Sequence, residues 1–421
     1  MLDIKFIREN KDFVKAGAKK KRLEFDADKL IEIDDKRREF MASIEKKRAE
    51  QNHVSQLISK SPDAKRDSLI GEMKVVKDAL QKEEEKLKEV VKEWQALMLA
   101  VPNIPDISVP EGESDTENIE VKSYGKQTYF PNPPKSHVDL MKSLDLADFE
   151  KGAEVAGFRG YYLKNDAVTL SFALWNFAYN FFIKEKGFTP MIAPSLVRKE
   201  ALMGTGYLPQ GKDDLYFTQD GDYLSGTAEV GTMAYFMDTI LEKKSLPMKI
   251  LAFSPCFRRE AGSHGKDTKG IMRVHEFYKL EQAVLCEASH EMSVKFHEEI
   301  NRNTEELMER LKLPYRTVVN CGGDLGLGQV KKYDIELWIP SEGKYREISS
   351  ASYFHDFQAR RLNIRYKDDA GKLRFVHSLN CTALPTPRIL ISIIENNQRP
   401  DGAINVPDVL EPYLGKKIIK R

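Results

Sequence analysis

Two long stretches near the amino terminus carry apolar residues at alternating intervals of three and four. In the first, over about 30–58, six of nine such positions are apolar, and in the second, over about 69–97, eight of nine are apolar. This spacing, sustained over about four heptads in each stretch, predicts coiled-coil helices. Pro62 lies in the short break between the stretches and cannot continue a helix. The two stretches are therefore predicted to form an antiparallel hairpin of two long helices.

A two-helix hairpin of this length is too thin to bury a core of its own, so we expect it to form an arm. Charge is concentrated there, since residues 1–100 hold 24 Lys or Arg and 21 Asp or Glu. Basic clusters such as 36–38 and 46–48 suit a polyanion, but acidic residues interleave with them. The pattern by itself leaves two interpretations open: a spacer or dimerisation device, or an arm that contacts nucleic acid.

Beyond the hairpin the hydrophobic pattern changes to that of a mixed domain. Turn-forming residues crowd 101–134, and we place a boundary near residue 110, which divides the chain into residues 1–110 and 111–421. Alternating runs joined by short loops favour an antiparallel sheet, and with the helical runs they predict an α+β fold. The predicted strands cover 249–253, 272–285, 316–319, 332–339 and 345–352, and the predicted helices cover 137–149, 168–183, 290–310 and 387–397.

Length and composition agree with this division. The chain has 421 residues, more than the roughly 250–300 that a single hydrophobic core serves. Its net charge of +1 excludes a surface that is basic throughout, and its four cysteines form no CxxC pair of a zinc ribbon. The amino terminus lacks the build of a signal peptide, and the most apolar stretch, 168–183, is too short to span a bilayer. We therefore expect a cytoplasmic protein with no membrane association.

The strongest chemical motif is Phe257-Arg258-Arg259-Glu260, which follows a predicted strand. A polar loop at 261–270 comes next, and the returning strand carries Arg273-Val274-His275-Glu276-Phe277. Arginine offers paired donors to phosphate or carboxylate oxygens, and an aromatic ring such as that of Phe277 stacks on a base. The arrangement suits a nucleotide, although a single Arg–Glu cluster is more often an exposed ion pair of little energetic weight.

A second motif, Glu347-Ile348-Ser349-Ser350, lies in a predicted strand. Carboxylate and hydroxyl oxygens suit Mg²⁺, which proteins usually hold with one or two carboxylates and the phosphates of a substrate. The alternation of a strand places Glu347 and Ser349 on one face and Ser350 on the other, unless a bulge changes its direction. A solvated strand face explains the same residues equally well.

Two further motifs adjoin predicted helices. Asn380-Cys381-Thr382-Ala383-Leu384 is followed by Pro385-Thr386-Pro387-Arg388 and a helical run. Proline suits the first turn of a helix, and Arg388 would lie at the helix start, where anions are favoured. Thr227-Ala228-Glu229 stands at a predicted strand-to-helix junction, where a simple helix cap is the alternative.

Taken together, these motifs resemble the class II aminoacyl-tRNA synthetases, and among them the bacterial-type seryl-tRNA synthetases. The resemblance covers essentially the whole chain and rests on the order and spacing of its motifs after the hairpin. The family's first signature corresponds to 187–194, a dimer-interface element. In the third signature, Cys381, Ala383 and Pro387 stand where the family commonly has glycine, whereas the arginine is kept as Arg388. The matching segments are the hairpin, TAE at 227–229, FRRE at 257–260, RVHEFYKLE at 273–281, EISS at 347–350 and VPDVLEPYLG at 406–415.

The resemblance implies an enzyme that activates L-serine with ATP to seryl-adenylate and transfers serine to the 3′ end of serine tRNA. Catalysis would rest on Arg258, Glu260 and Arg388. The implied serine contacts are Thr227, Ala228, Glu229, Arg258, Glu281 and Thr382; the implied ATP contacts are Arg258, Arg259, Glu260, Val274, Phe277, Glu347, Ile348, Ser349, Ser350 and Arg388; and the implied Mg²⁺ ligands are Glu347 and Ser350.

The same resemblance implies that the coiled-coil arm grips serine tRNA and that the enzyme is a homodimer; selenocysteine tRNA is a further candidate substrate. Three alternatives remain at this point. A catalytically silent paralogue would fail a pyrophosphate-exchange assay. A ligase that charges a carrier protein would share the catalytic domain but not the hairpin. A non-enzymatic coiled-coil scaffold would not bind ATP.

Overall fold

The computed structural model describes residues 1–263 and 265–421, so residue 264 of the predicted loop at 261–270 lies outside the described residues. The chain divides into two compact units. The first contains residues 1–19 and 23–102, and the second contains residues 20–22 and 103–421. The first unit is built around the predicted hairpin, and the second holds the sheet.

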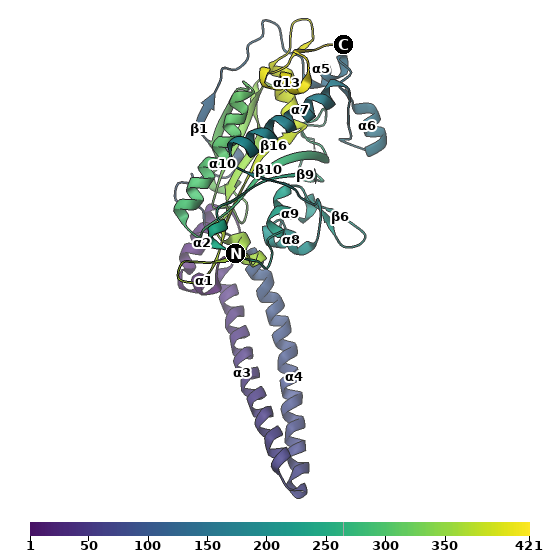
Figure 1. The fold of residues 1–421 in the computed structure, drawn as a ribbon. Helices are drawn as coiled ribbons and strands as arrows, with labels where there is room; N and C mark the ends of the chain where they lie inside the picture. The colour runs from purple at the N-terminus through teal and green to yellow at the C-terminus, as the bar shows by residue number, and fades with distance from the viewer. Residues whose placement is uncertain (264) are drawn as a thin grey trace. The chain divides into compact units, whose positions relative to one another are not determined.

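The arm consists of two long helices that lie side by side (Figure 1). They are α3 (Ala27–Lys60) and α4 (Asp63–Ala100), and both extend slightly beyond the predicted ranges. The Asp26 side chain caps α3 by accepting a hydrogen bond from the Lys29 amide, and Pro62 stands at the start of α4. The predicted antiparallel hairpin is thus confirmed, with its break at Pro62.

Polar residues on the apolar seam of the arm contact one another across it. The Lys47 ammonium lies 3.1 Å from the Glu83 carboxylate, and both stand at seam positions of the heptad pattern. The Arg37 guanidinium lies 4.5 Å from the ring centroid of Trp94 on the facing helix. These cross-helix pairs fix the register of the two helices, as polar seam residues do in other coiled coils.

Two short helices that the sequence pattern did not predict precede the arm, α1 (Ile4–Glu9) and α2 (Lys11–Lys20). Arg8 on α1 forms ion pairs with Asp34, at 3.1 Å, and with Asp35, at 2.6 Å. Because the Asp34 side chain is fully buried, this pair ties the short helices to the base of α3.

The second unit is organised around an eight-stranded sheet. Neighbouring strands are antiparallel, apart from the parallel pair of β4 and β9 at one edge, so the predicted antiparallel α+β domain is confirmed. In spatial order the strands are β1 (Ile119–Tyr124), β11 (Tyr315–Val319), β12 (Lys331–Ile339), β13 (Lys344–Tyr353), β16 (His377–Thr386), β10 (Glu276–Cys286), β9 (Met248–Phe257) and β4 (Thr189–Ile192).

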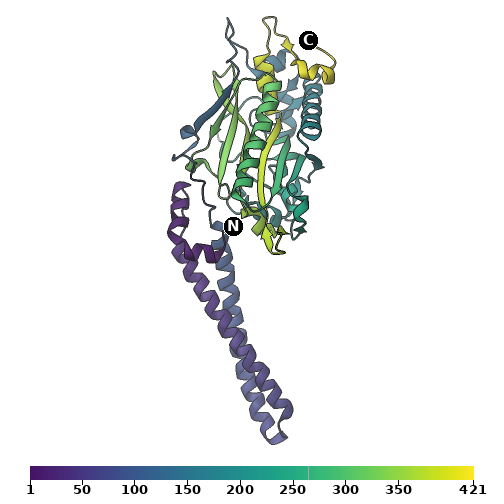
Figure 2. The ribbon, with the colours of Figure 1, turned by 60° about the vertical axis from the view of Figure 1, so that its left-hand side comes forward.

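Helices cover much of this sheet. Helix α10 (His290–Arg310) lies along one face of it against β13 and β16 (Figure 2). Helix α9 (Ala228–Ala234) packs against β9 and β10, and α12 (Arg388–Asn396) follows β16 directly. Helix α7 (Asp166–Asn180) confirms the buried helix predicted over 168–183. Shorter helices of this unit include α8 (Lys199–Thr205), α11 (Phe357–Leu362) and α13 (Glu411–Leu414).

Two local predictions need correction, and one central strand was missed. The helix predicted over 137–149 is divided into α5 (His137–Ser143) and α6 (Phe149–Ala156), because Asp145 between them takes a left-handed backbone with φ of 53°. The strand predicted from residue 272 begins only at Glu276. The central strand β16 was not predicted.

Of the helices in the described residues, none is long and apolar enough to cross a membrane.

Candidate active site

Strand β10 presents three polar or aromatic side chains on one face of the sheet. They are Phe277, Lys279 and Glu281. These residues occupy every second position of the strand, so their side chains point to the same face. The pairing of β10 with β16 shifts by one residue, so that Leu280 faces Leu384 while Glu281 faces Thr382. Because of this bulge, Thr382 of β16 lies opposite Glu281 of β10.

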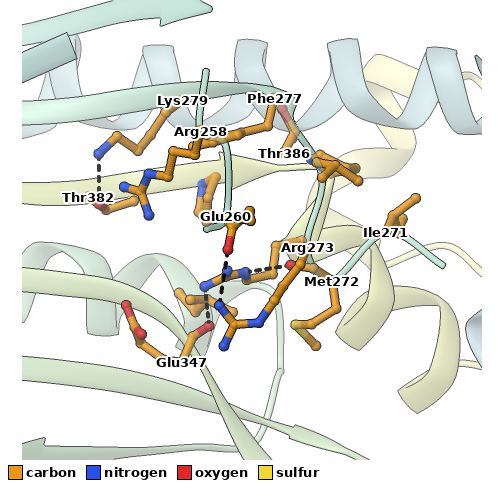
Figure 3. A pocket seen from close by; sticks show the side chains of 15 residues that line it. Arg258, Glu260, Ile271, Met272, Arg273, Phe277, Lys279, Glu347, Thr382 and Thr386 are labelled. Atoms are coloured by element: carbon orange, nitrogen blue, oxygen red, sulfur yellow. Dashed lines mark hydrogen bonds and ion pairs between the residues drawn. The ribbon is translucent and has the colours of Figure 1, made fainter. Parts of the chain in front are cut away.

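A cavity lies over this face, and we name it the arginine cavity (Figure 3). It gathers residues that lie far apart in the sequence, from the loop between β9 and β10 and from β10, β13, β16 and α12. Its lining consists of Arg258, Glu260, Ile271, Met272, Arg273, Val274, Phe277, Lys279, Glu347, Ile348, Thr382, Pro385, Thr386, Pro387 and Arg388.

Two of the three arginines that line this cavity, Arg258 and Arg388, are held by neutral backbone groups. Arg388 donates to the carbonyl oxygens of Met272, at 3.2 Å, and Glu347, at 2.9 Å. Arg258 donates to the Gly226 carbonyl at 3.3 Å, and its guanidinium lies 5.4 Å from the Phe277 ring centroid. Burial lowers the pKa of Arg388. Neither guanidinium forms an ion pair with a carboxylate of the described residues, so both keep donors for an anionic ligand.

Glu260 belongs to a polar group beside the arginines. Its carboxylate lies 3.3 Å from the Arg273 guanidinium and 3.8 Å from that of Arg159, and it accepts a hydrogen bond from Ser263. Neither Arg273 nor Arg159 was predicted to take part in the site. Arg273 stands in the quoted RVHEF segment, and its charge was the available signal.

A second, more acidic cavity adjoins the first and shares four of its residues. We name it the glutamate cavity. The shared residues are Arg258, Lys279, Glu347 and Thr382, and the others are Thr205, Gly206, Tyr207, Gln210, Gly211, Glu229, Gly326, Leu327, Gly328, Gln329, Ser350, Ser352, Phe354 and Asn380.

Glu229 is the buried carboxylate of the glutamate cavity. It accepts hydrogen bonds from Gln358 at 2.6 Å, Tyr207 at 2.8 Å and Asn380 at 3.0 Å. Burial, together with the nearby charge of Glu281, raises the pKa of Glu229 to about 7. The pattern of the sequence gave no indication that Tyr207 or Gln358 would meet this carboxylate.

Thr227 and Glu281 lie behind the two cavities and are almost completely buried. The Thr227 hydroxyl donates to the Glu281 carboxylate at 3.3 Å, and Asn380 donates to the same carboxylate at 2.9 Å. Lys279 forms an ion pair with Glu281 and donates to the hydroxyls of Thr227 and Thr382. Sequence analysis assigned Lys279 no role, although its place between Phe277 and Glu281 in a two-residue period was a usable signal.

A bulge in β13 makes Glu347 and Ser350 line the same cavity. Across β12 and β13, Ile335 pairs with Ser349 but the next residue, Glu336, pairs with Glu347, so Ile348 is the extra residue. Glu347 and Ser350 consequently both line the glutamate cavity, despite their odd separation.

Three of the remaining predicted contacts lie outside the two cavities. Ala228 is fully buried. Ser349 is buried, and its hydroxyl donates to the Thr382 carbonyl at 2.5 Å. Arg259 is exposed and donates to the Asp213 carbonyl at 3.1 Å. Val274 and Ile348, in contrast, line the arginine cavity.

Comparison with known proteins identifies the family. Residues 1–105 match the seryl-tRNA synthetase N-terminal domain, and residues 216–397 match the tRNA synthetase class II core domain (G, H, P, S and T). A serine–tRNA ligase of Deinococcus radiodurans is 42% identical over 417 residues, covering 99% of this chain and 98% of that protein. One of Treponema denticola is 41% identical over 421 residues, covering 99% of each. This chain belongs to the seryl-tRNA synthetase family.

Solved structures of seryl-tRNA synthetases share the whole fold. One from Pyrococcus horikoshii, described as complexed with ATP, has a TM-score of 0.91 at 40% identity and covers 100% of this chain and 99% of that one. One from Naegleria fowleri, described as in complex with AMP, has a TM-score of 0.86 at 33% identity and covers 100% of this chain and 99% of that one. A class II synthetase core preceded by a two-helix arm is therefore the architecture of this chain.

The departures of this family member from the glycine-rich third signature lie mainly in the core. Cys381 and Ala383 are fully buried on β16. The Cys381 sulfur lies 3.5 Å from the Thr304 hydroxyl of α10 and 3.5 Å from that of Ser349. Their side chains therefore replace glycine without entering the arginine cavity, whereas Pro387 lines it.

Proposed function

We propose that this chain activates L-serine with ATP and transfers the seryl group to the 3′-terminal ribose of serine tRNA. The observation that supports this most directly is the shared lining of the two cavities. Arg258 and Arg388 provide donors for a polyanion in the arginine cavity, while the adjoining glutamate cavity offers the buried carboxylate of Glu229 to an ammonium group. A nucleoside triphosphate and an amino acid are thereby brought together.

The first step joins serine to the nucleotide. A carboxylate oxygen of serine attacks the α-phosphorus, the bond from this phosphorus to the bridging oxygen breaks, and pyrophosphate leaves. Arg258 would hold both the serine carboxylate and the α-phosphate, which neutralises charge and aligns the reacting atoms. Phe277 and Arg388 would enclose the adenine, Glu260 would contact its edge, and the backbone of Val274 would contact the nucleotide. No protein nucleophile is required.

Glu347 and Ser350 would hold a magnesium ion beside the phosphates of ATP. Both line the glutamate cavity, and neither the Glu347 carboxylate nor the Ser350 hydroxyl has a hydrogen-bond partner within residues 1–263 and 265–421. Oxygen donors left open beside a phosphate site match the preference of Mg²⁺ for one or two protein ligands plus substrate oxygens. When bound, the ion would neutralise phosphate charge.

Serine selection would rest on hydroxyl recognition by Glu281 and Thr382. Serine differs from alanine by one hydroxyl, and a buried site built to bond that hydroxyl rejects the analogue lacking it by about 10⁴–10⁵-fold. The full burial of Glu281 and its bonds to Thr227 and Asn380 hold its carboxylate in place for this contact.

The variant Glu281→Ala is expected to raise the serine KM in pyrophosphate exchange by at least about 100-fold, because the substrate hydroxyl and ammonium lose a buried partner. The KM for ATP should change less than threefold. The control is Glu299→Ala, which removes a carboxylate paired with Lys249 at 2.6 Å outside both cavities. An unchanged serine KM in Glu281→Ala would contradict the assignment.

We also propose that two copies associate through the β4 edge of the sheet. The apolar side chains of Phe172 and Tyr179 on α7 and of Ile192 on β4 are 56%, 42% and 83% exposed. They line a continuous groove with Trp175 and Phe253, and exposed apolar surface of this kind marks an interface. The groove adjoins the family's dimer signature at 187–194, so a second copy is its occupant. Light scattering on purified protein should give twice the 48.2 kDa chain mass.

A cytoplasmic location suits the four cysteines, which are all buried free thiols.

The activity itself is tested by pyrophosphate exchange with each of the twenty amino acids, followed by charging of tRNA. Only serine should support exchange at micromolar to millimolar concentrations. Absence of exchange would favour a silent paralogue, and seryl transfer to a carrier protein in place of tRNA would favour the carrier-protein ligase.

A further inference from the structure

The Lys279 ammonium lies where the groups assigned to serine converge. Its side chain is buried, and it donates to the Thr227 hydroxyl at 2.8 Å and to the Thr382 hydroxyl at 3.4 Å. It also forms an ion pair with Glu281. Three of the groups expected to surround the substrate are therefore occupied by a cation that belongs to the protein.

The α-ammonium of serine has the same chemistry as the lysine head: a single positive charge and three N–H donors. The Thr227 hydroxyl already accepts from Lys279 and from the Glu229 amide, and it donates to Glu281. Two ammonium groups on one buried carboxylate would repel each other strongly in a site of low dielectric. If serine places its ammonium on Glu281 beside its hydroxyl, the lysine head has to leave that carboxylate.

A second location for this head is available nearby. Lys279 lines both the arginine cavity and the glutamate cavity, and its flexible four-carbon stem lets the ammonium move between them. Figure 3 shows the lysine head beside Thr382, on the same side of the strand as the Arg258 guanidinium. In the arginine cavity, the phosphates of bound ATP would provide the compensating negative charge.

We propose that Lys279 holds the serine-ammonium position in the empty enzyme and moves to the α-phosphate of ATP when serine binds. This inference rests on the proposed serine-activating function and adds a coupling to it. Serine binding would deliver a positive charge to the phosphorus that the serine carboxylate attacks, so ATP bound without serine would lack that charge. Lys279 exchanges no proton in this step and forms no covalent bond.

The first test separates substrate binding from turnover in Lys279→Met. Calorimetry without ATP should give a serine Kd that is unchanged or several-fold lower, because no cation has to be displaced. The kcat of pyrophosphate exchange should fall by about 100-fold or more, as for other donors to developing charge. The matched control is Lys249→Met on the neighbouring strand β9, which removes the ammonium paired with Glu299 of α10 and should leave both quantities unchanged.

Two results with this variant would overturn the proposal. A serine Kd raised tenfold or more with unchanged kcat would make Lys279 a direct serine ligand, and equal losses in both quantities with a lower melting temperature would make it a structural residue. A crystal structure of the unmodified enzyme with serine alone is independent of variant folding. The lysine head should then lie away from Glu281, and an intact Lys279–Glu281 pair beside bound serine would refute the exchange. Absence of serine-dependent exchange in the unmodified enzyme would instead refute the proposed function.

Discussion

Replacing residues 42–88 with a short Gly-Ser turn is expected to abolish charging of serine tRNA while serine-dependent pyrophosphate exchange stays within about twofold. The excised part contains the distal arm, including the Lys47–Glu83 pair, but keeps the base where Arg8 contacts Asp34 and Arg37 lies over Trp94. The physical reason is that tRNA affinity comes largely from cationic contacts to phosphates along an extended surface, none of which is needed for adenylate formation. Filter binding and charging assays measure the loss.

Controls separate tRNA binding from the other interpretations of the arm. If the arm is a dimerisation device, truncation will lower the molecular mass in solution, whereas a tRNA-binding arm leaves it unchanged. In the full-length enzyme, the tRNA Kd should rise with salt, because each phosphate contact releases counterions. Normal charging by the truncated protein would refute the assigned role, and parallel loss of exchange would show that the arm supports the fold of the catalytic unit.

The variant Arg388→Ala is expected to reduce serine-dependent pyrophosphate exchange by about 10³-fold. Loss of one preorganised donor to transition-state charge typically costs 10²–10³ in rate, and here the adenine platform is lost as well. The Met272 and Glu347 carbonyls would also lose their shared donor, which loosens the entrance of the arginine cavity. Exchange kinetics at varied ATP concentration should show both a lower kcat and a higher ATP KM.

Two further variants sharpen this experiment. Arg388→Lys keeps the charge but not the planar fork, so we expect it to recover less than a tenth of the lost rate. Arg374→Ala removes an exposed guanidinium paired with Asp368 at 3.1 Å and should behave as the unmodified enzyme. Exchange within threefold of the unmodified enzyme in Arg388→Ala would remove Arg388 from the nucleotide site.

Local patterns were enough to predict the arm and most of the sheet. Hydrophobic periodicity is a property of one segment, so α3, α4 and α10 could be recognised without knowledge of their neighbours. Strand β16 was missed because it is buried on both sides and alternates poorly, and its run from Asn380 to Leu384 was interpreted only as a motif. The divided helix near Asp145 was missed because a left-handed residue leaves little trace in the hydrophobic pattern.

Within the candidate site, the sequence by itself determined which residue types were available: paired arginines, an aromatic ring, carboxylates and hydroxyls in a recognisable order. Only the tertiary structure decided their neighbours. The bulge at Ile348 turns Glu347 and Ser350 to one cavity, and the register of β16 against β10 places Thr382 opposite Glu281 and within reach of Lys279. The reason is physical, since hydrogen-bond register and bulges are set by pairing between strands that are distant along the chain. No single strand carries that information in its own pattern.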